Sequence, residues 1–244
     1  MTTPLPPDAP PVIVARMSEL HVLRVFTTPS GEHGNGLGVF MRGGEVPEAK
    51  RQVVAGDLGF AETVFFDHPD RAEIRIFTPQ LELPFAGHPS VGTAWLLREK
   101  SGEVAVLRPP AGELRVRYEA EIVWVAARAE WSPPFEYIER PSAADVDALT
   151  GAPGAEGWAY CWAWEDEEAG RIRARSFVAE AGIAEDEATG SAALALCAQL
   201  GRPIQIRQGK GSEIFARPLG EGFTEVGGRS VADEVRDYPI VDKR

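Results

Sequence analysis

The stretch Glu82–Leu97, ELPFAGHPSVGTAWLL, places glycine, histidine and proline where a polar loop becomes an apolar segment. We expect a helix over about Pro89–Lys100, because its apolar residues recur at helical spacing and proline suits a first helical turn. The stretch Ala184–Leu200, AEDEATGSAALALCAQL, has the same plan. There, acids and Thr189–Ser191 lead into a second small apolar helix. The two stretches predict two halves of one site.

Strand patterns surround both predicted helices. Alternating or continuous apolar runs predict strands before the first helix, between the two helices and after the second, with one short helix starting at Ser142. The order strands, helix, strands occurs twice along the chain. This order predicts an α+β fold built from a duplicated unit, in which each sheet wraps around one apolar helix.

The chain is divided by its composition into three expected regions. Prolines in MTTPLPPDAPPVIVARM predict a disordered leader over residues 1–19, and Met17 is an alternative start of the native chain. An N-terminal α+β half is expected over residues 20–118 and a C-terminal α+β half over residues 119–244. We expect the last strand or tail to pack on the first half.

Composition and charge exclude several classes of function. The 244 residues carry a formal net charge of −12, which repels phosphate backbones and argues against nucleic-acid or anionic-membrane partners. No apolar run approaches the ~20 residues of a membrane span, and no basic, apolar signal peptide opens the chain. The two cysteines form no CxxC motif, which favours reduced thiols in a cytoplasmic protein. Neither GxGxxG nor GxxxxGK[ST] occurs, so the sequence gives no support for a nucleotide cofactor.

Few residues are candidates for chemistry. The four histidines show no metal-ligand spacing, so no metal site is predicted. His88 lies where a helix begins, and the positive helix end there favours the neutral imidazole and attracts anions. Its alternative role is a structural cap. Asp186, Thr189 and Ser191 at the second helix start have the same alternative, because such residues commonly cap helices.

Three motifs together resemble the PhzF-type phenazine-biosynthesis isomerase family, which is related in fold to diaminopimelate epimerase. AETVFF (Ala61–Phe66) resembles SETxF, RIFTPQLELPFAGHPSVGTAWLL (Arg75–Leu97) resembles RxFTPxxELPFAGHPTxGTA, and EDEATGSAALAL (Glu185–Leu196) resembles EDPATGSAAxAL. The weaker GNGLGVF (Gly34–Phe40) stands where GNPxAVF is expected. The resemblance spans about residues 20–230.

The resemblance implies two pseudo-symmetric halves, each a mostly antiparallel sheet around a central helix, with a site in the cleft between them. It implies a cofactor-independent isomerase without metal that moves a proton and a double bond on a small anionic carboxylic acid. A homodimer is expected on the same ground. The implied catalytic residues are Glu62 as acid/base with His88, Asp186 and Ser191, and the implied substrate-binding residues are Gly87, Thr189 and Gly190.

Alternatives remain open at this point. In the related epimerases two cysteines stand at the helix starts, near Ala86 and Glu187 here, while Cys161 and Cys197 lie elsewhere, which disfavours a two-thiol racemase. A non-thiol epimerase or racemase of an amino or hydroxy acid, or a non-catalytic small-acid binding protein, fits the same residues. Three residues depart from the motifs: Ala61, Glu187 and Gly36. The chain is also short for the family between about Glu130 and Trp158, which leaves the substrate open. Glu187 either raises the pKa of a neighbouring carboxyl by like-charge repulsion or points into solvent.

Overall fold

The structure, a computed structural model, describes residues 16–154 and 157–240. From the start of this region to residue 119 the elements, with η marking a 3-10 helix, are β1 (Arg16–Thr27), β2 (Asn35–Phe40), η1 (Gly43–Glu45), α1 (Glu48–Leu58), β3 (Glu62–His68), η2 (Pro69–Arg71), β4 (Glu73–Phe77), β5 (Glu82–Leu83), α2 (Gly87–Ser101), β6 (Val106–Leu107) and β7 (Leu114–Glu119). The remainder contains β8 (Ile122–Arg128), η3 (Ala129–Trp131), β9 (Glu136–Glu139), α3 (Ala143–Asp147), β10 (Ala159–Asp166), β11 (Arg171–Val178), η4 (Ala179–Ala181), β12 (Ile183–Asp186), α4 (Gly190–Leu200), β13 (Ile204–Gln208), β14 (Ser212–Gly220) and β15 (Phe223–Ile240).

The described strands form one connected sheet. Its main path runs β5-β4-β3-β2-β1-β15-β14-β13-β11-β10-β9, while β12 pairs with β11, and β8 joins β15 to β7 and β6. Only the pairs β2–β3, β9–β10 and β11–β13 are parallel among the described strands. The predicted mostly antiparallel α+β architecture is therefore confirmed.

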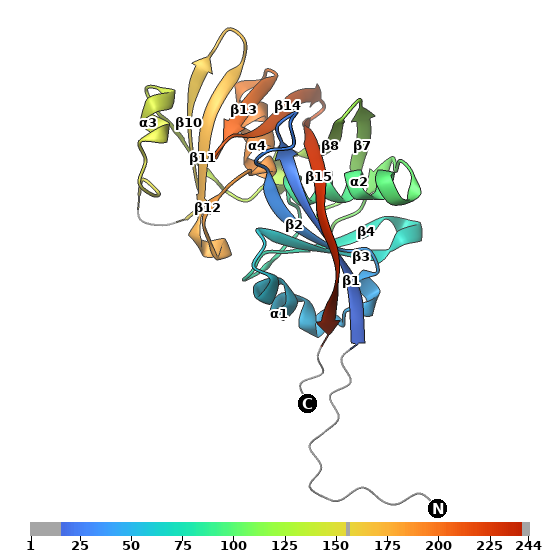
Figure 1. Cartoon of the computed structure of the whole chain (residues 1–244). Coiled ribbons are helices and arrows are strands. Elements are labelled where there is room, and N and C mark those ends of the chain that lie inside the picture. Colours follow the sequence, from blue (N-terminus) through green and yellow to red (C-terminus); the bar gives the residue numbers. More distant parts are fainter. Residues whose placement is uncertain (1–15, 155–156, 241–244) are drawn as a thin grey trace, which may run out of the picture.

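The long strand β15 joins the two ends of the chain and the two parts of the sheet. Its first residues pair with β14 and β8, and the rest runs antiparallel to β1, with Arg16 opposite Ile240 (Figure 1). The last strand thus packs on the first strand, although the division of the chain at residues 118 and 119 stays a prediction.

Each of the two long buried helices follows a strand, a 3-10 turn and a second strand. The path β3, η2, β4 leads through the two-residue strand β5 to α2, and the path β11, η4, β12 leads directly to α4. Both 3-10 turns end at a residue in the left-handed region, Ala72 with φ 54° and Gly182 with φ 85°. This repetition agrees with the duplicated unit that the sequence predicts.

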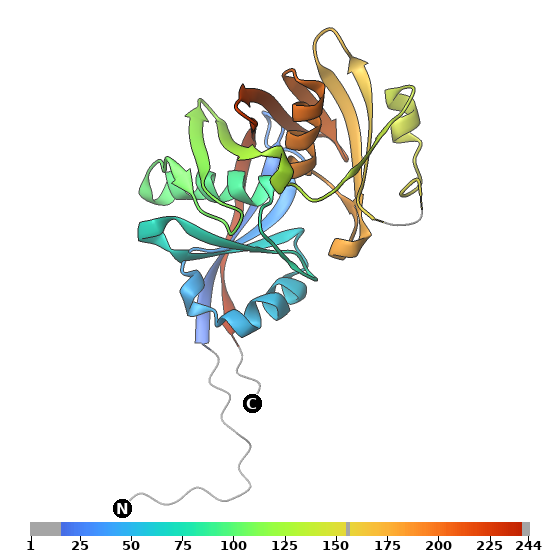
Figure 2. The same ribbon diagram turned by 180° about the vertical axis from the view of Figure 1, so that it is seen from behind.

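The helices α2 and α4 lie together in the middle of the molecule (Figure 2). α2 contacts β1, β8 and β15, and α4 contacts β14 and β15. One cluster of buried apolar side chains, running from Leu23 to Val226, includes residues of both helices. A single core therefore fixes the position of one helix relative to the other.

Three elements differ from the sequence-based expectations. Residues 16–19 of the expected leader belong to β1, where pairing with β15 holds them, and residues 1–15 lie outside the described part of the chain. Helix α1 was not predicted, although Pro47 precedes it and Gly59, in the left-handed conformation, ends it. β15, within the region where the sequence predicts strands after the second helix, is one 18-residue strand, because pairing with β1 extends it.

The starts of α2 and α4 touch through two glycines. A Cβ atom on Gly87 would lie 2.6 Å from the carbonyl carbon of Gly190, and one on Gly190 would lie 2.9 Å from the backbone nitrogen of His88. Such distances are shorter than real side chains show. Glycine at both positions is thus a condition for the two helix starts to meet.

We predict that Gly87→Ala destabilises the protein by about 1–3 kcal/mol, since the added methyl group forces the two helix starts apart. The free energy of unfolding from denaturant titration measures this. Gly151→Ala is the matched control, because nothing lies within 4 Å of a Cβ atom there. Equal stability of the two variants would contradict the close packing.

Candidate functional site

Glu62 and His88 meet at the starts of β3 and α2. Glu62 is 8% exposed and His88 is 2% exposed. The Glu62 Oε2 and His88 Nδ1 atoms are 3.0 Å apart. The contact is an ion pair when His88 is protonated. Glu62 Oε2 and His88 Nε2 have no hydrogen-bond partner among the described residues. Buried polar atoms of this kind are uncommon, and they leave the pair free to bind a ligand.

Asp186, at the end of β12, is 4% exposed and is held by two neutral donors. Asn35 Nδ2 donates to its Oδ1 at 2.6 Å, and Thr189 Oγ1 donates to its Oδ2 at 2.6 Å. Asn35 also donates to the Ala188 carbonyl oxygen at 3.2 Å. Because Asn35 belongs to β2, a residue of the first part of the chain orients a carboxylate of the second part.

Electrostatic effects couple the three ionisable groups. Burial raises the pKa of Asp186 to about 6, the negative charge of Glu62 adds to the increase, and His88 and the two hydrogen bonds oppose it. Burial alone would lower the pKa of His88, but Glu62, Asp186 and the Gly36 carbonyl outweigh it and raise this pKa above its ordinary value. The expectation of a neutral imidazole is wrong in direction, because the carboxylate beside His88 counts for more than the helix end.

Both helix starts lack a side-chain cap. Ala86 and Thr189 occupy the N-cap positions of α2 and α4, and neither accepts a hydrogen bond from its helix. The Thr189 hydroxyl points to Asp186 instead. The first-turn N–H groups of two adjoining helices therefore have no side-chain partner at the cap, an arrangement that favours an anion such as a carboxylate.

The other predicted site residues lie at this junction. Ser191 is buried in the first turn of α4, and its hydroxyl forms no hydrogen bond with another described residue. Gly87 and Gly190 form the contact between the helices. The structure thus brings together all seven predicted site residues, while their roles in catalysis and substrate binding stay predictions.

Two contributors were missed by the sequence-based reasoning. Asn35 sits in the weakly matching GNG segment, whose asparagine was the available signal. Gln208 on β13 donates to the Asp186 carbonyl oxygen and to Thr189 Oγ1, both at 2.9 Å. No motif marks Gln208, and only the pairing of β13 beside β11 brings it here.

Glu187 behaves in neither of the two ways expected. Its carboxylate accepts hydrogen bonds from the Lys210 backbone nitrogen at 2.9 and 3.0 Å and from Ser212 Oγ at 2.8 Å. Glu62, not Glu187, is the carboxylate that raises the pKa of Asp186. Glu187 is thus bound to the turn before β14, and it neither points into solvent nor adds repulsion to the site.

Neither cysteine is placed for catalysis. Cys161 lies in β10 and Cys197 lies seven residues into α4, and both are buried. Burial raises the pKa of Cys161 to about 11 and that of Cys197 to about 12. The thiols therefore stay protonated near neutral pH, and the helix starts carry no thiol.

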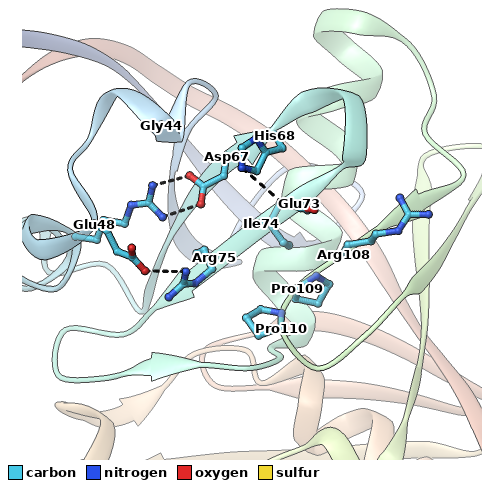
Figure 3. A pocket seen from close by; sticks show the side chains of 11 residues that line it. Gly44, Glu48, Asp67, His68, Glu73, Ile74, Arg75, Arg108, Pro109 and Pro110 are labelled. Carbon is cyan, nitrogen blue, oxygen red and sulfur yellow. Dashed lines mark hydrogen bonds and ion pairs between the residues drawn. The ribbon is translucent and has the colours of Figure 1, made fainter.

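A groove of about 570 Å³ lies at the other end of β3 (Figure 3). Its three arginines each pair with a carboxylate: Arg51 with Asp67, Arg75 with Glu48, and Arg108 with Glu113. Since its charges are already compensated, it offers less to an anionic ligand than the helix starts. No helix within residues 16–154 and 157–240 is long and apolar enough to cross a membrane.

We predict that Asp186→Asn gains stability relative to the wild type as the pH rises. The folded state binds the Asp186 proton more tightly than the unfolded state. The stability that this proton gives the wild type is therefore fully present below about pH 3.8 and is lost as the pH rises through about 6. The stability difference should therefore grow by about 3 kcal/mol between pH 4 and pH 8. Urea titrations across this range measure it, with exposed Asp70→Asn as the control; a difference that does not change with pH would contradict the buried carboxylate.

Sequence comparisons identify known proteins that are similar to this chain. Residues 23–157 match the sequence model of the PhzC-PhzF family, described as phenazine biosynthesis-like protein. The trans-2,3-dihydro-3-hydroxyanthranilate isomerase of Pseudomonas aeruginosa is 30% identical over 221 residues, covering 75% of this chain and 80% of that protein. An uncharacterized isomerase of Pasteurella multocida is 35% identical over 108 residues, covering 41% of this chain and only 37% of its own length.

Solved structures share the fold. A PhzF-family phenazine biosynthesis protein from Enterococcus faecalis matches with a TM-score of 0.70 and 19% identity, over 91% of this chain and 99% of that one. A hydroxyproline epimerase from Agrobacterium vitis, with bound trans-4-hydroxy-L-proline, matches with a TM-score of 0.65 and 12% identity, over 93% and 94% of the two chains. At these identities the likeness shows the fold alone. Because the family model covers more than half of the sequence, we conclude that the chain belongs to the phenazine biosynthesis-like PhzC-PhzF family.

Proposed function

We propose that the protein is a cofactor-independent isomerase that moves a proton, and with it a double bond, on a small unsaturated carboxylic acid. The observation that carries this proposal is the buried Glu62–His88 pair beside two uncapped helix starts. The pair supplies a base and a cation with unused hydrogen-bonding capacity. The helix starts supply N–H groups for the carboxylate of a substrate.

Each residue has a defined part in the proposed reaction. Glu62 removes a proton from one carbon, the double bond shifts, and the same carboxyl group returns the proton to the other end of the shifted system. His88 Nε2 has no hydrogen-bond partner among the described residues, and it donates to a polar substituent of the substrate. Ser191, in the first turn of α4, donates a further hydrogen bond to the substrate. Burial of the whole cluster excludes water from the step.

The names of the relatives suggest the first probe. trans-2,3-Dihydro-3-hydroxyanthranilate, the compound in the name of the Pseudomonas aeruginosa relative, is a small unsaturated acid of the required class. The isomerase activity and the carboxylate substrate rest on such relatives and on the site geometry together. The homodimer implied by the family resemblance and the cytoplasmic location stay predictions.

A non-thiol epimerase is the second candidate. The observation that favours it is that Glu62 and Asp186 interact from two different parts of the fold, with the pKa of Asp186 at about 6, so that two bases are available. Such an enzyme would exchange and invert one Cα, for example in trans-4-hydroxy-L-proline, the ligand of the Agrobacterium vitis structure. The buried, protonated cysteines argue against the thiol version of this chemistry.

We predict that Glu62→Gln lowers turnover by about 10²–10⁴-fold, because the variant keeps the shape of the side chain but removes the acid/base group. Small unsaturated acids, beginning with trans-2,3-dihydro-3-hydroxyanthranilate, are first screened by thermal shift. Binding compounds are then followed by ultraviolet absorbance and NMR in deuterated water. Turnover by Glu62→Gln within a few-fold of the wild type would disprove the role of Glu62.

The same experiment separates the candidates. The isomerase moves a double bond and changes the ultraviolet spectrum, whereas the epimerase labels and inverts one carbon without such a change. A non-catalytic binding protein shows saturable binding and no solvent exchange. Exposed Glu103→Gln is the matched control for the loss of one carboxylate, and its turnover should equal that of the wild type.

A further inference from the structure

A row of buried polar side chains lies behind Asp186. It runs from Tyr160 on β10 through Gln208 on β13 to Thr189 at the start of α4. Tyr160 and Gln208 have no exposed surface, and Thr189 is 6% exposed. Burying polar groups in this way costs stability unless each is hydrogen-bonded, and here each one is.

The directions of these hydrogen bonds follow from the chemistry of the groups. A backbone carbonyl can only accept, so the Gln208 atom 2.9 Å from the Asp186 carbonyl oxygen is the amide nitrogen. The other N–H of this amide donates to Thr189 Oγ1 at 2.9 Å. Tyr160, whose pKa is held well above its ordinary value by burial, stays protonated and donates to Gln208 Oε1 at 3.0 Å.

The remaining bond of the row ends on the carboxylate. Because the Gln208 amide nitrogen is itself a donor, the Thr189 hydroxyl cannot donate to it, and it donates instead to Asp186 Oδ2, 2.6 Å away. The order of donation is therefore Tyr160 to Gln208 to Thr189 to Asp186. Reversing the bond from Tyr160 or from Gln208 would place two donors or two acceptors face to face, and the charged form of Asp186 can only accept from Thr189.

We propose that Gln208 is a positioning residue for Asp186, acting through Thr189: its amide fixes the Thr189 hydroxyl as a donor and so holds the carboxylate of Asp186 charged and aimed at Glu62 and His88. Only the part of this inference that concerns catalysis rests on the proposed function. The hydrogen-bond direction itself is independent of any substrate.

The hydrogen-bonded row acts against the groups that raise the pKa of Asp186. Glu62 from β3 and His88 from α2 act on it by charge, and Tyr160 from β10 is the nearby neutral phenol. Burial and Glu62 raise the pKa of Asp186, and the hydrogen bonds from Thr189 and Asn35 lower it. Gln208 favours the first of these two bonds, because the Thr189 hydroxyl cannot donate towards the Gln208 amide nitrogen.

NMR titration of the full-length protein with ¹³C-labelled aspartate tests the proposal, with the Asp186 resonance identified by its absence in Asp186→Asn. In Gln208→Met the midpoint of the Asp186 titration should rise by roughly one pH unit, because one enforced hydrogen bond to the charged carboxylate is lost. Thr189→Val should raise it similarly. The double variant should show no more than the effect of Thr189→Val alone, since Gln208 acts through that residue.

Gln205→Met is the matched control, being the same change at an exposed position of the same strand, and it should leave the midpoint at the wild-type value. An unchanged midpoint in Gln208→Met, or additive effects in the double variant, would overturn the proposal and leave Gln208 a packing residue. Should Gln208→Met not fold, Gln208→Asn replaces it, because an amide one methylene shorter cannot bridge both acceptors; an unchanged midpoint there has the same consequence. Failure to find turnover would refute the proposed function without moving these midpoints.

Discussion

The contact between the starts of α2 and α4 is the constraint on which the site depends. Each helix presents the positive end of its dipole, and the meeting of Gly87 with Gly190 places the two positive ends side by side without caps. That arrangement is unfavourable unless negative charge lies close by. Glu62 and Asp186 provide this charge, and so the same packing that requires glycine also places two buried carboxylates beside the positive helix ends.

The charges of Glu62, His88 and Asp186 do not fully balance those of the two helix starts. The pKa values of Asp186 and His88 are both raised, which means that the cluster holds protons more strongly than the isolated groups do. A substrate carboxylate at the helix starts would add a further negative charge. The raised pKa values act in the direction that lets the cluster take up a compensating proton, so binding of an anion and proton uptake are coupled by the architecture itself.

The sequence was sufficient for the parts of the fold that short patterns encode. The loop-to-helix stretches at residues 82–97 and 184–200 predicted both buried helices. Ser142 predicted the start of α3, where its side chain does accept from the Asp145 backbone nitrogen. What could not be predicted depends on pairing between distant segments. The length of β15 follows from its ladder with β1, and the position of Gln208 follows from the place of β13 in the sheet. The ionisation of His88 likewise depends on Glu62, which is 26 residues away in sequence and 3.0 Å away in space.

Glu187 departs from the family motif, and its hydrogen bonds lie outside the reacting groups. Its carboxylate accepts from Ser212 Oγ, and this hydroxyl oxygen accepts in turn from the Gly34 backbone nitrogen at 3.0 Å. Gly34 adjoins Asn35, which donates to Asp186. A proline at position 187 would have no side-chain acceptor for this connection. The glutamate therefore ties the loop before β2 to the turn before β14, next to the asparagine that donates to Asp186.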